Sequence, residues 1–307
     1  MHNAPRVNMG ISGHFHLVLR KASGEVKQEL EFDNLITDNG LRAIITDSLG
    51  TFNAHVGTGT ATPTFSDVKL ANPLAQTSLG SGAGPVSYRS RTEPPFWTQM
   101  SIKRTFPPGV GTGVLTEIGM APSANLDLVH TRTLIKDANG NPTSITKLAD
   151  DFLDVTYTIR TAIPNVDVPF SFNLNGQTVT GFIRPLGLSD TLNVKWQPAI
   201  SLPTFITSAG AMTPYTGALP VIHGSGNPTG LLLGPSEITT VNDTVNLRRR
   251  YTCTWNPDRG NMDIKSLMTY VGHGSERCRY GIQFDTPIMK TASQRFRFMF
   301  DIGVARG

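Results

Sequence analysis

Apolar and polar side chains alternate along several stretches of the chain, with the period of two expected of a half-buried β-strand. In residues 13–37, Phe15, Leu17 and Leu19 alternate with polar positions, and a second alternating run follows the turn sequence KASGE. Two such runs on either side of a turn predict a β-hairpin with one face in water.

The same period recurs later in the chain. Residues 152–163 alternate Leu153, Val155, Tyr157 and Ile159 with polar side chains, which predicts a strand with one buried face. The last strand candidate places an apolar row on one face: Phe296, Phe298, Phe300, Ile302 and Val304. Shorter strand candidates bounded by Gly, Pro or Asn are residues 96–109, 113–122 and 128–135, and three more strand-like segments follow at residues 248–255, 263–271 and 277–284.

Helical spacing is found in residues 38–50. Asp38 and Asn39 form a polar start and Gly50 a stop. The apolar positions that share one helical face are Leu41, Ile44, Ile45 and Leu49. A second short helix is expected after Ser66 or Asp67, either of which could cap it. We therefore expect one or two short helices.

Composition supports a mainly β fold. Charged residues are only 16% of the 307 residues, while 30 Gly and 21 Pro suit many turns between short strands. We expect an antiparallel β-sandwich-like body formed by residues 11–163 and 251–307, interrupted by a loop-rich β insertion at 164–250. Residues 196–236 contain no Lys, Arg, Asp or Glu, which favours a loop-rich insertion or a surface covered by another chain.

Export and membrane signals are not found in the sequence. No stretch approaches 18 uninterrupted apolar residues, and the first residues lack the apolar core of a signal peptide. We expect no membrane insertion. Cys253 and Cys278 are the only cysteines, and we interpret them as buried structural thiols, with their pairing left open.

Residues 135–144, IKDANGNPTS, resemble a calcium loop at first sight. Asp137, Asn139 and Asn141 match its alternating ligand positions, but Pro142 replaces the required Gly and no Glu occupies the twelfth position. Asn-Gly at 139–140 instead predicts a type I′ hairpin turn.

Other candidate chemistry is equally incomplete. Asp150, Asp151 and Asp154 form a carboxylate cluster without a predicted pocket, and we expect turn capping and a wet strand face there. His14 and His16 share a strand face, but two ligands are too few for a closed zinc site. The sequence contains no G-x-S-x-G nucleophile motif. We expect no catalytic residue, no cofactor and no bound metal.

Basic residues are concentrated at the end of the chain. From Arg248 onward there are eleven Lys and Arg against five Asp and Glu. Arg248–250 are contiguous, Arg277 and Arg279 share one strand face, and Arg295 and Arg297 share another. Adjacent strands could stack these pairs into a basic stripe. Because the interleaved aromatic residues belong to the core face, a subunit interface is favoured over nucleic acid.

Five stretches occur in an order that resembles a known family: residues 32–41, 56–75, 115–122, 128–160 and 286–306. The resemblance is to tail structural proteins of tailed bacteriophages, of tail-tip, baseplate or tail-fibre type, and it covers residues 30–163 and 251–307. It implies a non-enzymatic virion component, synthesised in the host cytoplasm, that forms a homo-oligomer and attaches to other phage tail proteins or fibres.

Candidate interaction residues come from the insertion and from the basic strands: Trp196, Phe205, Tyr215, Arg277, Arg279, Arg295 and Arg297. The alternative is a carbohydrate-binding module of the tail tip that recognises a host surface glycan, for which Trp97, Trp196 and Trp255 are the aromatic candidates. An enzyme acting on surface polysaccharide is a third hypothesis, and no motif supports it.

Overall fold

The computed structural model describes residues 4–46, 53–80, 86–89, 96–188, 212–222, 227–273 and 276–307. Most of these residues lie in strands, and the described part of the chain contains one helix. The predicted mainly β fold is confirmed. The described residues contain no helix that is long and apolar enough to cross a membrane.

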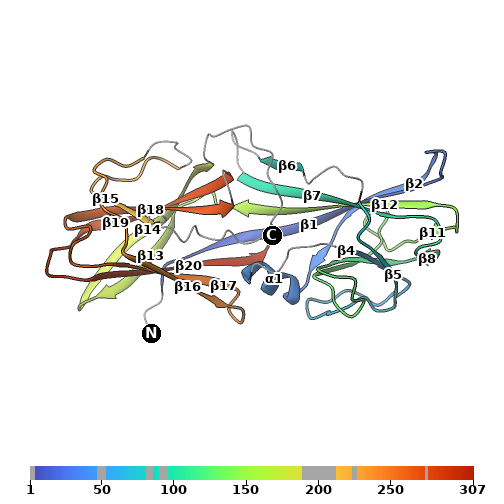
Figure 1. Cartoon of the computed structure of the whole chain (residues 1–307), viewed down its shortest axis with the longest axis horizontal. Coiled ribbons are helices and arrows are strands. Elements are labelled where there is room, and N and C mark those ends of the chain that lie inside the picture. The colour runs from blue at the N-terminus through green and yellow to red at the C-terminus, as the bar shows by residue number, and fades with distance from the viewer. Residues whose placement is uncertain are drawn as a thin grey trace.

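An eight-stranded sheet, here called the long sheet, runs along the molecule (Figure 1). Its path in order is β16 (Glu237–Asp243), β17 (Arg248–Trp255), β20 (Phe296–Arg306), β1 (Arg6–Arg20), β12 (Phe152–Ile163), β7 (Phe96–Phe106) and β6 (Val86–Arg89), and β2 (Val26–Asp33) also pairs with β1. Two strands share one edge of β1. β20 pairs with it in parallel over residues 6–11, and β2 pairs antiparallel over residues 14–20.

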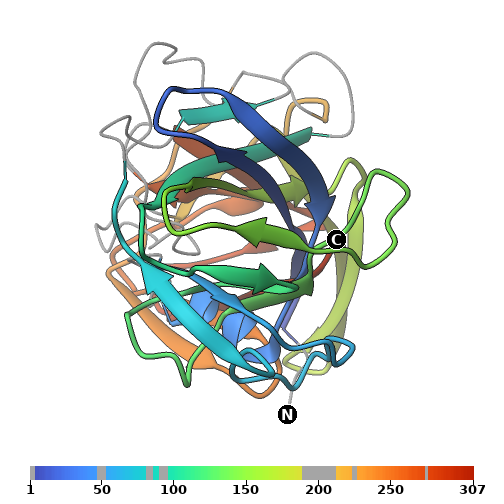
Figure 2. The same ribbon diagram turned by 90° about the vertical axis from the view of Figure 1, so that its right-hand side faces the viewer.

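Smaller sheets pack at the two ends of the long sheet. The second sheet, on the left in Figure 1, has the order β13 (Val168–Leu174), β14 (Gln177–Leu188), β19 (Glu276–Met289), β18 (Asp263–His273) and β15 (Met212–Tyr215). The third sheet, on the right, has the order β3 (Leu35–Ile36), β10 (Thr131–Leu134), β9 (Glu117–Ala121), β4 (Asn53–Gly57) and β5 (Pro73–Thr77). β8 (Gly113–Leu115) and β11 (Ile145–Lys147) form a separate two-stranded sheet near the same end. Figure 2 views the molecule from this end.

The predicted hairpin and its wet face are confirmed. β1 and β2 are joined by a tight turn in which Gly24 N donates to Lys21 O at 3.0 Å. Phe15 and Leu17 are fully buried, while His14 and His16 on the opposite face are partly exposed. The alternation of polar and apolar residues thus places one face of the hairpin on the core.

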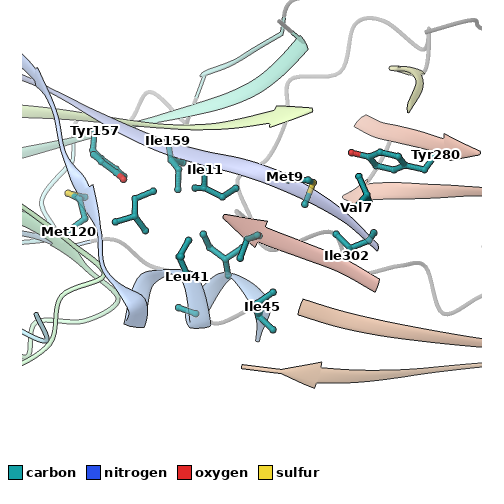
Figure 3. Close-up of a cluster of buried hydrophobic side chains, with 14 of the residues drawn as sticks. Val7, Met9, Ile11, Leu41, Ile45, Met120, Tyr157, Ile159, Tyr280 and Ile302 are labelled. Atoms are coloured by element: carbon teal, nitrogen blue, oxygen red, sulfur yellow. The ribbon is translucent and has the colours of Figure 1, made fainter. Parts of the chain in front are cut away.

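Helix α1 (Asp38–Ile45) confirms the helix predicted from residues 38–50, whose last positions lie outside the described residues. Its N-cap is Thr37, not Asp38 or Asn39, because the Thr37 hydroxyl accepts from Gly40 N at 3.1 Å. Leu41 and Ile45 face β1 and β20 in the core (Figure 3). The helix therefore fills the space beneath the long sheet.

The second predicted helix is wrong. The chain forms a turn over Thr64–Asp67, because the Asp67 carboxylate accepts from Thr64 N at 2.8 Å and from the Thr64 hydroxyl at 2.7 Å. Asp67 therefore bonds back to Thr64 and does not cap the residues that follow it, and residues 68–72 are not helical.

The range 164–250, expected as a loop-rich insertion, contains paired strands in its described part. β13, β14 and β15 pair within the second sheet, and β16 and β17 extend the long sheet. Ile183 and Met212 belong to the same buried cluster as Phe15 and Ile302. The described portions of this range therefore share one core with the residues on either side.

The type I′ turn assigned to Asn139-Gly140 is wrong, although the chain does reverse there. Only Gly140 has a positive φ, at 82°, and its N–H donates to Asp137 O at 2.9 Å. Among the residues that the structure describes, the two-residue turn with both φ positive is Asn175-Gly176, at 51° and 86°, between β13 and β14. Asp137 explains the difference, since its carboxylate accepts from the backbone N–H groups of Asn139 and Asn141, both at 2.9 Å.

Candidate interaction surfaces

The predicted interaction residues lie in different environments. Trp196 and Phe205 lie outside the described residues, and for Arg277 and Arg279 only the backbone, in β19, is described. Tyr215 is 5% exposed and packs in a buried cluster with Leu186, Leu219 and Met268. Its side chain is thus part of the local core and not of an open surface.

Arg295 and Arg297 are both exposed, before and within β20. Arg295 lies 3.6 Å from Glu237 at the start of the edge strand β16. Arg297 makes no hydrogen bond or ion pair, and among the basic side chains that the structure describes it is alone in this.

The basic stripe expected from the sequence forms only in part. β17 and β20 are adjacent, with Arg250 opposite Asp301 and Thr254 opposite Arg297, so Arg248, Arg250 and Arg297 share one face. β19 belongs to the second sheet and pairs with β14 and β18, so its arginines do not extend this row by strand pairing.

Two of the three arginines in this row on β17 and β20, Arg248 and Arg250, are paired with an acidic residue. Asp301 is fully buried and accepts from Arg248 at 2.7 Å and from Arg250 at 2.8 and 2.9 Å. Arg249, on the opposite face, donates to Ile45 O at 2.7 Å, at the end of the helix. These arginines stabilise the fold, which leaves Arg297 as the open cation of the row.

A groove of about 190 Å³ lies beside Arg297. It is bounded by the tip of the β13–β14 hairpin, by β20 and by the residues before β1: Ala4, Pro5, Phe172, Asn173, Leu174, Asn175, Arg297, Phe298 and Met299. Phe172 contacts Phe298 edge to face, with ring centroids 6.0 Å apart. The groove thus combines an apolar base with one open guanidinium.

β16 forms one edge of the long sheet. It pairs only with β17 among the described strands, and five of its seven residues are exposed. Val241 near its middle is 61% exposed. Residues 238–242 contain no charge and no proline, so the unpaired backbone lacks the usual protection against strand addition.

The other described edge strands of five or more residues carry such protection. β2 presents the charged side chains of Lys27, Glu29 and Glu31. β5 begins with Pro73, and β13 has Pro169 as its second residue. β15 has only four residues, and its edge that does not face β18 accepts a hydrogen bond from the chain itself, from Leu232 N to Pro214 O.

A polar pocket of about 290 Å³ opens where β20 and β2 share the edge of β1; its lining is Ser12, Gly13, His14, Asp33, Thr158 and Arg160. Ser12, His14 and Asp33 are the residue types of a hydrolytic triad. However, His14 Nδ1 donates to Asp33 at 2.9 Å, and Nε2 lies 3.9 Å from Glu31. Neither ring nitrogen of His14 is hydrogen-bonded to Ser12 in the described part of the chain, so the contact between base and nucleophile that a triad needs is not formed.

The acidic cluster at 150–154 is divided among separate ion pairs. Asp151 pairs with Lys27 at 2.6 Å, and Asp154 pairs with Arg20 at 2.9 Å and with Lys103 at 3.0 Å. Asp154 is therefore buried, although the alternating pattern placed it on a wet face. Among the described residues, no three His, Cys, Asp or Glu side chains are arranged to hold a metal ion.

The loop between β4 and β5 is fixed by a buried carboxylate, Glu117, which strand periodicity alone does not identify. Glu117 is fully buried and accepts from the N–H groups of Gly59, Ala71 and Asn72 at 2.8–3.0 Å. In the sequence, the position of Glu117 within the apolar strand sequence LTEIGMA is the feature that indicates a buried and hydrogen-bonded carboxylate. A Cβ atom at Gly57 or Gly59 would lie no more than 2.6 Å from Glu117 Oε1, so both positions need glycine for the close packing around this carboxylate.

Trp255 is fully buried, with its ring centroid 5.3 Å from that of Phe296, so it offers no platform to a sugar. The side chain of Trp97 and all of Trp196 lie outside what the structure describes. No protein family model, curated protein or solved structure matches this chain.

Proposed function

We propose that this chain is a non-enzymatic structural component of a bacteriophage tail that assembles as an oligomer and attaches other tail proteins or fibres. The observation that carries the assembly role is β16, an exposed edge strand without protection along residues 238–242. An edge of this kind pairs with an added strand through backbone hydrogen bonds. The attribution to a phage tail rests on the ordered sequence resemblance, and the protein would be made in the host cytoplasm and incorporated into the virion.

The uncharged stretch at 196–236 supports the same role. In its described part, Val221, Leu231 and Leu233 are 74%, 69% and 61% exposed. Exposed apolar side chains close together in sequence, without charges between them, suit a surface covered by a partner.

The assembly role is tested by light scattering on the purified full chain over a range of concentrations. The wild type should associate, and Val241→Lys should weaken association because a lysine on an open edge opposes strand pairing. Val245→Lys is the matched control, because Val245 is 87% exposed but lies in the turn after β16. A wild-type chain that remains monomeric, together with its absence from purified virions by mass spectrometry, would contradict the proposal.

A carbohydrate-binding role at the tail tip is the second candidate. The polar pocket at Ser12, His14 and Thr158 favours it, since hydroxyl and imidazole groups can bond sugar hydroxyls. A glycan array probed with the full chain tests this role: binding to a host surface glycan that Thr158→Val abolishes would support it, and no binding to any glycan would exclude it.

A further inference from the structure

The groove beside Arg297 is preformed by contacts that do not involve Arg297 itself. Asn175 and Gly176 form the tight turn at the hairpin tip, where Asn173 Oδ1 accepts from Gly176 N at 2.9 Å. On the opposite side, Asp301 N donates to Pro5 O at 2.8 Å and fixes the segment before β1. The walls are therefore held in place without any ligand.

The lining defines the chemistry of an occupant. Phe172, Leu174 and Phe298 supply apolar surface, and Arg297 supplies one positive charge with no acidic partner. A single guanidinium matches a single carboxylate, which it can bind through two parallel hydrogen bonds. A doubly charged phosphate would bring a second negative charge to an apolar wall with nothing to balance it.

The size of the groove limits what can enter. At about 190 Å³ it is smaller than the roughly 300–1,000 Å³ of pockets for drug-sized molecules. It therefore suits one large apolar side chain at a time and not a whole cofactor or a long lipid chain.

We propose that this groove binds a segment of a partner protein in which a large apolar side chain is followed by an aspartate or glutamate. The apolar side chain enters against Phe172 and Phe298, and the neighbouring carboxylate pairs with Arg297. The inference rests on the proposed assembly role for its biological setting, but the groove itself lies two strands away from β16, so the two can be tested separately.

The probe is a blocked peptide, acetyl-Gly-Leu-Glu-Gly-amide, titrated into the full chain and followed by NMR chemical shifts. Its matched control carries Gln in place of Glu, and a second control carries Gly in place of Leu. The wild type should bind the Leu-Glu peptide at least about tenfold more tightly than either control, because each loses one of the two interactions.

The protein variants are Arg297→Gln and Arg295→Gln. Arg297→Gln should lose at least about tenfold in affinity, whereas Arg295→Gln should bind as the wild type does, because Arg295 does not line the groove. Equal binding by Arg297→Gln, or equal binding of the Glu and Gln peptides, overturns the proposal. Val241→Lys should leave peptide binding unchanged. If the groove binds but the wild type stays monomeric and is absent from virions, only the assembly role fails.

Discussion

Arg132 and Glu117, on the adjacent strands β10 and β9, form a buried ion pair in which Arg132 Nε donates to Glu117 Oε2 at 3.0 Å. Arg132 is 3% exposed, and it also donates to Ala61 O at 2.8 Å and pairs with Asp67. The two side chains thus connect the third sheet to both halves of the loop at 58–72. These contacts hold the loop, which contains four Thr and one Gly, against the third sheet.

Glu117→Gln should destabilise the protein by roughly 2–4 kcal/mol, because Arg132 would keep its charge in a buried site with one partner fewer. Hydrogen exchange of the Ala71 and Asn72 amides should accelerate more than exchange in β12, and urea unfolding gives the overall change. Lys69→Ala is the control: its pair with Asp127 is exposed, and such pairs contribute about 0–1 kcal/mol. Equal effects of the two substitutions would show that Glu117 does not hold the loop.

Gly13→Ala should destabilise the β1–β2 hairpin by roughly 1–3 kcal/mol. A methyl group at Gly13 would overlap Tyr157 Oη and Asn34 Oδ1, and the Tyr157 ring cannot retreat because it packs on Phe15 at 4.8 Å. Gly10→Ala, on the same strand, meets its nearest atoms at 3.4–3.5 Å and should change stability little. Urea unfolding of both variants measures the difference, and a harmless Gly13→Ala would mean that the Tyr157 side chain can shift.

The sequence predicts those helices and strands whose buried positions repeat at regular spacing over a short stretch of chain. The hairpin, the helix and the buried faces of β12 and β20 follow from spacing that repeats within a dozen residues. The parallel pairing of β1 with β20 does not, because it joins the two ends of the chain and leaves no local signal.

Because strand pairing leaves no local signal, the burial and the ion-pair partners of polar residues are also not predictable from alternation. Asp301 fits the wet face of its strand by alternation, yet it is buried because pairing of β17 with β20 brings Arg250 opposite it. Arg295 and Arg297 are equivalent in sequence, but only Arg295 lies near an acidic residue, Glu237. Sequence spacing placed both on one face, and only the folded structure distinguishes them, because Glu237 pairs with Arg295 and not with Arg297.

The Cys253 thiol should be unreactive toward a water-soluble disulfide reagent in the folded protein. It is a free thiol, 1% exposed, and burial raises its pKa to about 12, so little reactive thiolate is present at neutral pH. The measurement uses the Cys278→Ser variant, so that only Cys253 can react, with and without denaturant. Fast labelling of the folded variant would contradict the buried placement of this residue.

Stability should fall as the pH is lowered from about 6.5 to about 4, and His130 is the main cause. Its side chain is 5% exposed, and burial lowers its pKa from 6.5 to about 4. Between these values the unfolded chain binds a proton that the folded chain does not, so acid favours unfolding, and the stability lost on crossing the window is roughly 3 kcal/mol. Burial also lowers the pKa of His55, which adds to the same slope.

Urea unfolding midpoints measured across this pH range test the assignment. His130→Gln cannot take up the proton, so its stability should depend less steeply on pH between 6.5 and 4, whatever its stability at neutral pH. His16→Gln is the control, because the His16 side chain lies on the partly exposed face of β1 beside Glu29 and is not buried. If His130→Gln keeps the full wild-type slope, the acid sensitivity arises elsewhere in the protein.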